Sequence, residues 1–397
     1  MTTRRDSGTP QFSAARQISN ERGAVLALMA LLLIVFLGLA ALAIDLGMLY
    51  VARGEAQRSA DAAAHAGAGW LMQNPGASDQ EIRNEAIKFG TINRVRGGEV
   101  VINDHDVEIL WDERKIRVTA HRTTAEGNPV RSLFARAIGF GDVDVAARAA
   151  AQIWPGEGSD CILPFAIPDH WYVNDGGTLR DATIGDMYDA ARGDVYVPAA
   201  GERDPSLGEP GYTGYGTYRI GQQLQLTSAD PSDSPQPGWY YAIRLTGSQG
   251  AKDYRESIKS CWDPDGERVL GEEVDKEPGN MVGPTKQGFG DIFDDPDEQN
   301  MEWDYDLKCP VQDGGDTCVG VESRRVRPLV MFDPSDWEFI ANGAKPVPIT
   351  AFGGVFLESW DGNNSVTVRW MRYETLTPAQ NWEDCPDCLL QMIRIVE

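Results

Sequence analysis

The segment "GAVLALMALLLIVFLGLAALAI", Gly23 to Ile44, contains no charged residue. An α-helix rises about 1.5 Å per residue, so this segment would be roughly 33 Å long, enough to cross a bilayer core of about 30 Å. A single segment can cross lipid only as a helix, because a helix satisfies every backbone N–H and C=O group internally. The sequence therefore predicts one membrane-spanning helix in a chain of 397 residues whose remainder is polar.

Charges on either side of this segment predict its orientation. The C-terminal flank mixes both signs, whereas arginine predominates in the N-terminal flank. The N-terminal charges are Arg4, Arg5, Arg16 and Arg22 against Asp6 and Glu21. Because arginine is in excess on the cytoplasmic side of a single span, we expect residues 1–22 to form a cytoplasmic tail and residues 23–44 to form the transmembrane helix. The bulk of the chain is then exported.

Two kinds of processing compete with a retained anchor. A signal peptide has an apolar region of about 7–15 residues followed by a small-residue cleavage site. The segment here is longer, and no clear cleavage site precedes Asp45, although Ala40, Ala41 and Ala43 are small. A prepilin site has a glutamate at the fifth position after its glycine, where this chain has Leu28. The sequence therefore favours a helix that stays attached.

The composition limits the partners of the exported part. The chain has 36 basic and 60 acidic residues, a net charge of −24, and the excess of acid lies after residue 60. A body this acidic repels nucleic acid and anionic surfaces, so no nucleic-acid partner is expected. The apolar content of 42% is sufficient for folded cores.

Six cysteines lie in the exported part and none precedes residue 161. They are Cys161, Cys261, Cys309, Cys318, Cys385 and Cys388. An even number beyond a membrane span predicts disulfides in an oxidising compartment. Cys309 and Cys318 bracket the turn-rich "CPVQDGGDTC" and are the favoured local pair, whereas Cys385 and Cys388 could close on each other or reach further. The "NWED" and "LLQMIRIV" that flank this CxxC do not resemble a redox site at a helix N-terminus, and no second CxxC is present to complete a zinc site.

Beyond Ile44 the helical pattern continues to Gln73, where Asn74-Pro75-Gly76 ends it. Small residues recur on one face of this extension: Ala56, Ala60, Ala64, Ala68, Ala63 and Gly67. Such a face allows close packing, either on the protein's own domain or against a like helix of a homologous subunit, and we take a partner contact as the hypothesis. Asp45, at the outer edge of the span, either pairs with a cation on a partner helix or meets water.

Residues 45–154 are expected to form a small α+β module on this helix, in the manner of a pilin. Ser78 and Glu81 form a capping box at the start of a helix over 78–92. Strands are expected over 100–111 and 115–122, the second from the alternation in "KIRVTAHR". A helix "PVRSLFARAIG" and a strand "DVDVAARAAAQI" complete the module.

The turn-forming residues 155–159 predict a boundary, and residues 155–397 are expected to form a mainly β domain with disulfides. Helical signals there are few, "AKDYRESIKSC" being the clearest. Strand candidates are "DVYVP", "QLQLTS", "GWYYAIRL", "RVRPLVMF", "VPITAFGGVFLESW", "SVTVRWMRY" and "LLQMIRIV". The predicted fold class is therefore α+β: one transmembrane helix, a pilin-like α+β module, and a mainly β exported domain.

The N-terminal residues resemble a known family. The segment "ERGAVLALMALLLIVFLGLAALAIDLGMLYVARGEAQRSADAAAHAGA" is similar to the N-terminal signature of TadE/TadG-like proteins of the tight-adherence (Flp) pilus machinery, although His65 replaces a frequent leucine. Segments such as "CILPFAIPDHW" and "GNMVGPTKQG" resemble longer TadG-type domains. The resemblance implies a single-pass inner-membrane protein with a periplasmic body, whose partners are the inner membrane and other pilus-assembly proteins.

Metal and catalytic motifs are incomplete. Asp230, Ser232 and Ser234 match the spacing of a metal-dependent adhesion motif, but prolines surround them, which favours a turn. In "CWDPDGERVLGE" a cysteine occupies the first position of a calcium loop, which needs an oxygen ligand. The acidic run 291–306 lacks loop spacing, so no cofactor is expected, with calcium as the alternative. Four scattered histidines, His65, His105, His121 and His170, form no recognised catalytic motif, and Asp169-His170 is expected to be structural.

The sequence thus predicts a membrane-anchored, non-catalytic component of a Flp pilus assembly or secretion system. The alternatives are a metal-dependent surface adhesin and an exported thiol oxidoreductase. The identity of the partners, the oligomeric state and the disulfide connectivity are left open at this stage.

Overall fold

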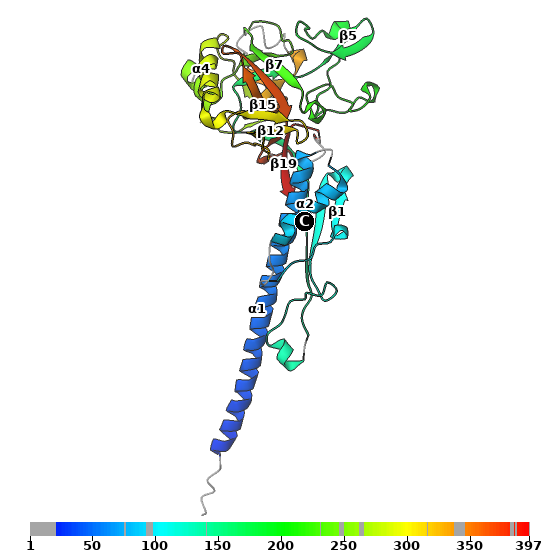
Figure 1. The fold of residues 1–397 in the computed structure, drawn as a ribbon, viewed down its shortest axis with the longest axis vertical. Coiled ribbons are helices and arrows are strands. Elements are labelled where there is room, and N and C mark those ends of the chain that lie inside the picture. Colours follow the sequence, from blue (N-terminus) through cyan, green and yellow to red (C-terminus); the bar gives the residue numbers. More distant parts are fainter. Residues whose placement is uncertain are drawn as a thin grey trace, which may run out of the picture.

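A long helix projects from a small module, and a β domain lies at the opposite end of the molecule from the N-terminus (Figure 1). The computed structural model describes residues 21–74, 77–92, 98–139, 141–230, 232–245, 250–261, 266–315, 317–336, 346–381, 385 and 387–396. This arrangement confirms the predicted α+β class with a long apolar N-terminal helix and a mostly β C-terminal region.

The first helix, α1, runs without interruption over Glu21–Gln73. The backbone and side-chain amides of Asn74 both donate to the carbonyl of Trp70, at 2.8 and 3.1 Å, and so cap the last turn. The prediction that one helix continues from the apolar segment to Gln73 is therefore confirmed. The second helix, α2, covers Asp79–Ile92, and the Ser78 amide donates to the Glu81 carboxylate at 2.7 Å, as a capping box requires.

The module sheet has the order β1-β2-β3-β19-β17. Its strands are β1 (Val107–Leu110), β2 (Lys115–Arg122), β3 (Val145–Ser159), β19 (Leu390–Ile395) and β17 (Tyr373–Glu374). Along β2, buried and partly exposed residues alternate strictly, as its sequence predicts. The first strand is shorter than expected, because a 3-10 turn over Asp104–Asp106 precedes it.

The chain does not leave the module at residue 155. β3 continues through Pro155 to Ser159, and β19, expected in the β domain, pairs antiparallel with β3 from Gln391↔Pro155 to Ile395↔Ala151. The C-terminal strand thus returns to the middle of the molecule (Figure 1). The boundary expected at residue 155 therefore falls inside β3, a strand that the module and the β domain share.

The helix expected from "PVRSLFARAIG" is absent apart from a short 3-10 turn, Ala135–Ile138. Val130 and Val143 pair as an isolated antiparallel bridge, so the segment between them is a loop. Gly139 ends the turn with φ = 90°, a conformation that an L side chain rarely adopts.

The β domain is built on a closed barrel of the order β13-β15-β16-β7-β8-β4. Its strands are β13 (Val326–Phe332), β15 (Ala351–Trp360), β16 (Ser365–Met371), β7 (Gln223–Ser228), β8 (Trp239–Ala242) and β4 (Phe165–Pro168). The barrel closes where β4 pairs with β13, and this pair and the pair of β7 with β8 are parallel. Most expected strands are present, but "DVYVP" contributes only a bridge from Val195 to Tyr172.

Two helices pack against the barrel. The expected helix α3 covers Ala251–Ser260, and α4, which the sequence analysis missed, covers Val282–Phe293. Ile258 of α3 and Phe289 of α4 are fully buried in a common core with barrel residues such as Val355. The remaining short strands are β5 (Tyr172–Asp175), β6 (Thr178–Asp181), β9 (Arg268–Val269), β10 (Glu273–Val274), β11 (Met301–Asp304), β12 (Cys309–Gln312), β14 (Val347–Pro348) and β18 (Thr377–Pro378).

Candidate functional site

The apolar half of α1 lies outside every core of the described protein. Most of its large side chains from Val25 to Ile44 are exposed, and its most apolar stretch has no buried share. By length and composition the helix can cross a membrane. This half of α1 therefore presents an apolar cylinder to its surroundings.

The small-residue face of α1 is buried within the module. Ala56, Ala60, Ala63, Ala64 and Ala68 have no exposed surface and belong to one core with Ile82 of α2 and Ile116 of β2. The hypothesis of a partner contact through this face is therefore wrong for the folded module, and the intramolecular alternative holds. A methyl group added at Gly67 would lie 3.0 Å from Ile116 Cγ2, so even this position has no room for another helix.

The close approach of α1 and α2 explains why small residues are needed there. Ser59 Oγ donates to the Gly90 carbonyl at 2.7 Å across the two helices. A Cβ at Gly90 would lie 2.8 Å from the Ala63 methyl group and would also overlap Ile102. The two backbones can meet at this distance only because neither helix carries a larger side chain there.

Asp45 has neither of the roles that were considered from the sequence. It is 6% exposed, and its carboxylate accepts three backbone N–H groups, from Leu133 at 3.0 Å, Phe134 at 3.1 Å and Ala135 at 2.6 Å. Burial raises the pKa of Asp45, but the three backbone donors outweigh burial and hold the pKa below its ordinary value. Asp45 thus acts as the cap of the 3-10 turn that follows Phe134.

The segment held by Asp45 is the 130–143 loop, defined here as the described residues 130–139 and 141–143. The Val130–Val143 bridge joins the two ends of the loop. Just before the loop in the chain, the Arg122 guanidinium donates to the Asn128 carbonyl at 2.7 Å. The loop runs beside α1 toward the N-terminus and reaches about halfway down that helix (Figure 1). At its tip, Leu133 is 60% exposed and Phe134 is 44% exposed.

A groove of about 710 Å³ lies beside the extension of α1, on a different face from the small-residue core. It is lined by Ala62, Ala66 and Gly69 of α1, Phe89 of α2, and Thr317 and Cys318 from the loop after β12. The sequence pattern does not single out this face, because its small residues alternate with His65 and Trp70 and do not form a uniform stripe.

Three disulfides stabilise the β domain: Cys161–Cys261, Cys309–Cys318 and Cys385–Cys388. The favoured local pair, Cys309–Cys318, is present, and the CxxC closes on itself. Cys161–Cys261 joins the end of β3 to the end of α3 across a sequence separation of 100 residues. No sequence signal singled out this last pair.

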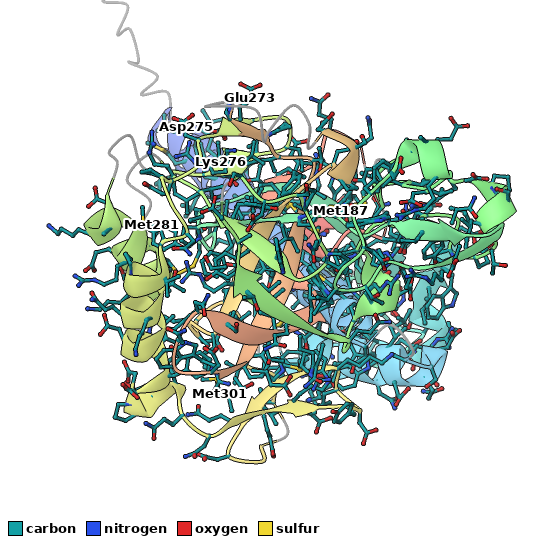
Figure 2. All side chains as sticks on the ribbon, turned by 90° about the horizontal axis from the view of Figure 1, so that it is seen from above. Met187, Glu273, Asp275, Lys276, Met281 and Met301 are labelled. Carbon is teal, nitrogen blue, oxygen red and sulfur yellow. A yellow bond between two sulfur atoms is a disulfide. The ribbon has the colours of Figure 1, made fainter. Side chains whose placement is uncertain are left out.

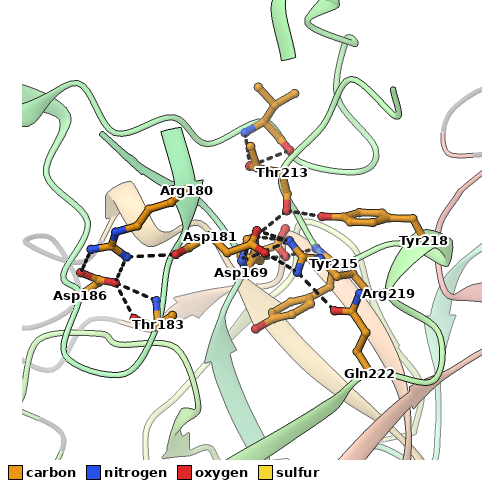
Figure 3. Close-up of polar contacts among 12 residues, drawn as sticks. Asp169, Arg180, Asp181, Thr183, Asp186, Thr213, Tyr215, Tyr218, Arg219 and Gln222 are labelled. Carbon is orange, nitrogen blue, oxygen red and sulfur yellow. Dashed lines mark hydrogen bonds and ion pairs between the residues drawn. The ribbon is translucent and has the colours of Figure 1, made fainter. Parts of the chain in front are cut away.

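A polar cluster of the β domain surrounds Asp169 and the neighbouring His170 (Figure 3). Asp169 is fully buried and accepts from the backbone amides of His170 and Tyr215, at 2.8 and 2.7 Å. Burial raises the pKa of Asp169 to about 6. The His170 ring lies 2.8 Å from the Thr213 carbonyl and beside Arg219, and burial together with that cation lowers its pKa to about 4.

This cluster connects the loop 181–186 to the barrel. Arg219 pairs with Asp181 at 2.8 Å, and Arg180 pairs with Asp186 at 2.6 Å (Figure 3). His170 itself is 4% exposed. Since the shifted groups are buried and bonded to one another, the arrangement fits the expected structural role of Asp169 and His170.

The metal motifs are used for local structure where the structure describes them. Asp230 accepts from the Ser232 amide at 3.0 Å, which is a turn, and residues 262–265 of the calcium-loop match lie outside the described residues. In the acidic run, Glu298 accepts from Ser323 Oγ at 2.6 Å. Met301, further along the same run, lies near the edge of the β domain in the view of Figure 2 and packs against its core. Within the described residues no group of three or more histidine, cysteine, aspartate or glutamate side chains could hold a metal ion.

Comparison with known proteins identifies one segment. Residues 23–70 match the family model Tad, Flp pilus-assembly TadE/G-like. No curated protein and no solved structure matches the chain. The matched residues cover the apolar half of α1, Asp45 and most of the extension, which confirms there the resemblance inferred from the sequence.

Proposed function

We propose that this TadE/G-like protein is a membrane-anchored, non-catalytic component of a Flp pilus assembly or secretion system. Its inner-membrane anchor is residues 23–44, its N-terminal tail is cytoplasmic, and its module and β domain lie in the periplasm. The observation that carries the proposal is the exposed apolar half of α1, continuous with a rigid extension that is buried in the module. The family match over residues 23–70 supports the role in pilus assembly.

The mechanism is one of positioning. A single unbroken helix transmits the orientation of the membrane segment to the module, because the extension is fixed by α2 and by the sheet. The module in turn shares β3 with the β domain, so the three parts are joined by continuous secondary structure. The β domain would then be held at a fixed height above the bilayer, where other pilus-assembly proteins can bind it.

The groove beside α1 is the surface that we assign to those partners. It combines apolar walls with His65 and Glu85 and remains open after the module has folded. A bulky residue at Ala66, in the variant Ala66→Trp, should fill the groove and reduce cross-linking to other pilus-assembly proteins. A tryptophan at Ala68 cannot serve as a control for this variant, because Ala68 is buried in the module core and the substitution would disrupt the fold.

Anchoring and assembly are tested separately. Alkaline carbonate should leave the intact chain in the membrane pellet, and external protease should reach the β domain in spheroplasts but not in whole cells. Deletion of the gene should reduce Flp pili, with restoration by the wild type and not by Ala66→Trp. Normal piliation in the deletion strain would contradict the role in assembly, and release by carbonate would contradict the anchor.

No observation in the described residues favours either alternative function, the thiol oxidoreductase or the metal-dependent adhesin. Both sulfurs of the CxxC pair are in a disulfide and both cysteines are buried, whereas a thiol oxidoreductase needs an accessible thiolate. The adhesin alternative predicts calcium-dependent stability of the β domain, which a thermal melt of the full chain with and without chelator would detect.

A further inference from the structure

The 130–143 loop lies at the depth where α1 leaves its apolar segment. Asp45 directly follows Ile44, the last residue of that segment, and it binds the backbone amides of Leu133, Phe134 and Ala135. Hydrogen bonds of this length fix the loop tip within a few ångströms of the Asp45 carboxylate. The tip is therefore level with the end of the span that we propose crosses the bilayer.

The side chains at this tip have the character of an interfacial segment. Leu133 and Phe134 are exposed, whereas Ser132, which directly precedes them, is buried. Arg131 and Arg136, one on each side of the apolar pair, are exposed. Apolar residues that enter the headgroup–acyl boundary, flanked by basic residues whose heads remain in water, are typical of segments that lie on a membrane.

The neighbouring surface of α1 supports a lipid occupant. Leu42, Ile44 and Leu46 are each about half exposed at the same level, so the apolar band of the helix extends to the loop. Within the loop one acid, the exposed Asp142, stands against Arg131 and Arg136, and Asp144, just after the loop, accepts from the amide and hydroxyl of Thr124 at 2.6 and 2.7 Å. The tip of the loop therefore presents apolar and basic groups, and the acid of the loop lies next to Val143, at the bridge to Val130.

We propose that the 130–143 loop is a second membrane contact, which inserts Leu133 and Phe134 into the headgroup–acyl boundary of the bilayer that α1 crosses. The inference rests on the proposed anchor. Its consequence is orientation: one helix alone can tilt and rotate in lipid, whereas a helix and a loop joined through Asp45 fix the tilt of α1 and its rotation about its own axis.

The depth of the loop can be measured with nitroxide labels. The six native cysteines are paired, so one introduced cysteine gives one labelling site. The full chain is reconstituted in vesicles of phosphatidylcholine and phosphatidylglycerol with a label at Leu133→Cys or Phe134→Cys. Val35→Cys, in the span, is the lipid control, and Leu376→Cys, 90% exposed in the β domain, is the aqueous control.

Collision of each label with oxygen relative to a water-soluble nickel chelate reports its depth. We expect labels at 133 and 134 to give ratios far above that of Leu376→Cys but below that of Val35→Cys, because the headgroup–acyl boundary is shallower than the middle of the span. Ratios equal to that of Leu376→Cys, with Val35→Cys still in lipid, would overturn the loop contact and leave the anchor standing. An aqueous ratio at Val35→Cys would instead remove the anchor itself.

The link through Asp45 needs a second variant. In Asp45→Ala the three backbone amides lose their acceptor, so the label at Phe134→Cys should become more mobile and its ratio should fall toward the aqueous value. Gly54→Ala, a change on α1 with no neighbour within 4 Å, should leave the ratio at Phe134→Cys unchanged. An unchanged ratio in Asp45→Ala would show that Asp45 does not hold the loop in the membrane.

Discussion

The module around the extension of α1 is packed from small apolar side chains, whereas the β domain buries charged groups and carries the three disulfides. In the module, α1 and α2 approach closely at Gly90, where an added Cβ would lie 2.8 Å from the Ala63 methyl group. In the β domain, Arg327 and Asp169 have no exposed surface at all. The module therefore depends on shape, and the β domain depends on cross-links and satisfied polar groups, so different perturbations should act on each.

The largest difference should follow from removing the long-range disulfide. Replacing both Cys161 and Cys261 with alanine frees a loop of about 100 residues, and the chain-entropy estimate for that loop is about 4.7 kcal/mol. Peptides of β13 and β16 should then exchange hydrogen faster in the full chain, while peptides of β2 should not. The same replacement of Cys309 and Cys318, which close a short loop, should cost about 2.5 kcal/mol. Equal acceleration in β2 would mean that the two bodies unfold as one.

The second perturbation removes a buried cation from the β domain. Arg327 donates to four backbone carbonyls, those of Cys161, Ile162, Ser257 and Ile258, at 2.7 to 3.2 Å. Burial lowers its pKa to about 10, so it remains charged at neutral pH. Arg327→Met leaves these carbonyls without a donor and should destabilise the β domain by about 3 kcal/mol.

A surface arginine of the module provides the matched control for Arg327. Arg117 pairs with Glu108 at 2.9 Å, and the glutamate is half exposed. Arg117→Met should therefore cost less than about 1 kcal/mol. Chemical denaturation followed separately in each body would test both values, and similar losses in the two variants would contradict the difference drawn here.

Shape dependence of the module is tested at two glycines. Gly90→Ala adds a methyl group that overlaps Ile102 and Ala63, and the resulting overpacking should cost about 2 kcal/mol. Gly54→Ala lies on α1 with no atom within 4 Å and should stabilise the helix by about 0.5–1 kcal/mol. The thermal midpoint of the module should move in opposite directions for the two variants. A loss at Gly54→Ala would indicate a contact that the folded monomer does not make.

The sequence predicted the features that depend on local pattern. The apolar length of α1, the capping box at Ser78 and the alternation along β2 each need only neighbouring residues, and all three are present. The small residues of α1 were identified as a packing face, but pattern alone could not say whether the partner was the same chain. The answer depended on Gly90 and Ile116, which are distant in sequence.

Features that depend on long-range pairing were missed for the same reason. β3 continues through Pro155 because β19, far along the chain, pairs with it there. Asp45 was assigned to water or to a foreign cation, because the amides that it binds belong to a segment that was expected to be a helix. In α4, three glycines and a proline argued against a helix from the sequence, but packing against α3 stabilises one there.

The smallest effect in the wild type should be the response of the Asp169–His170 cluster to acid, because its two titrations oppose each other. The pKa of His170 is lowered to about 4, so the stability that it contributes is present above its unfolded pKa of about 6.5 and is lost as the pH falls to 4. The pKa of Asp169 is raised to about 6, so its contribution is lost as the pH rises through 6 and is regained on acidification toward 3.8. Between pH 6.5 and 4 the two changes largely cancel.

Single variants separate the two titrations. His170→Gln removes only the loss of stability that His170 causes on acidification. The β domain of this variant should therefore gain thermal stability relative to the wild type as the pH falls from 6.5 to 4. Asp169→Asn removes only the stability that Asp169 regains on acidification, so this variant should show the opposite trend. Its side-chain oxygen still accepts from the amides of His170 and Tyr215. The difference between variant and wild-type melting temperatures at each pH cancels the other carboxylates, and β2 of the module should show no such difference. Parallel curves for both variants would mean that neither group titrates in this range, and the β domain would then owe its response to acid to surface carboxylates alone.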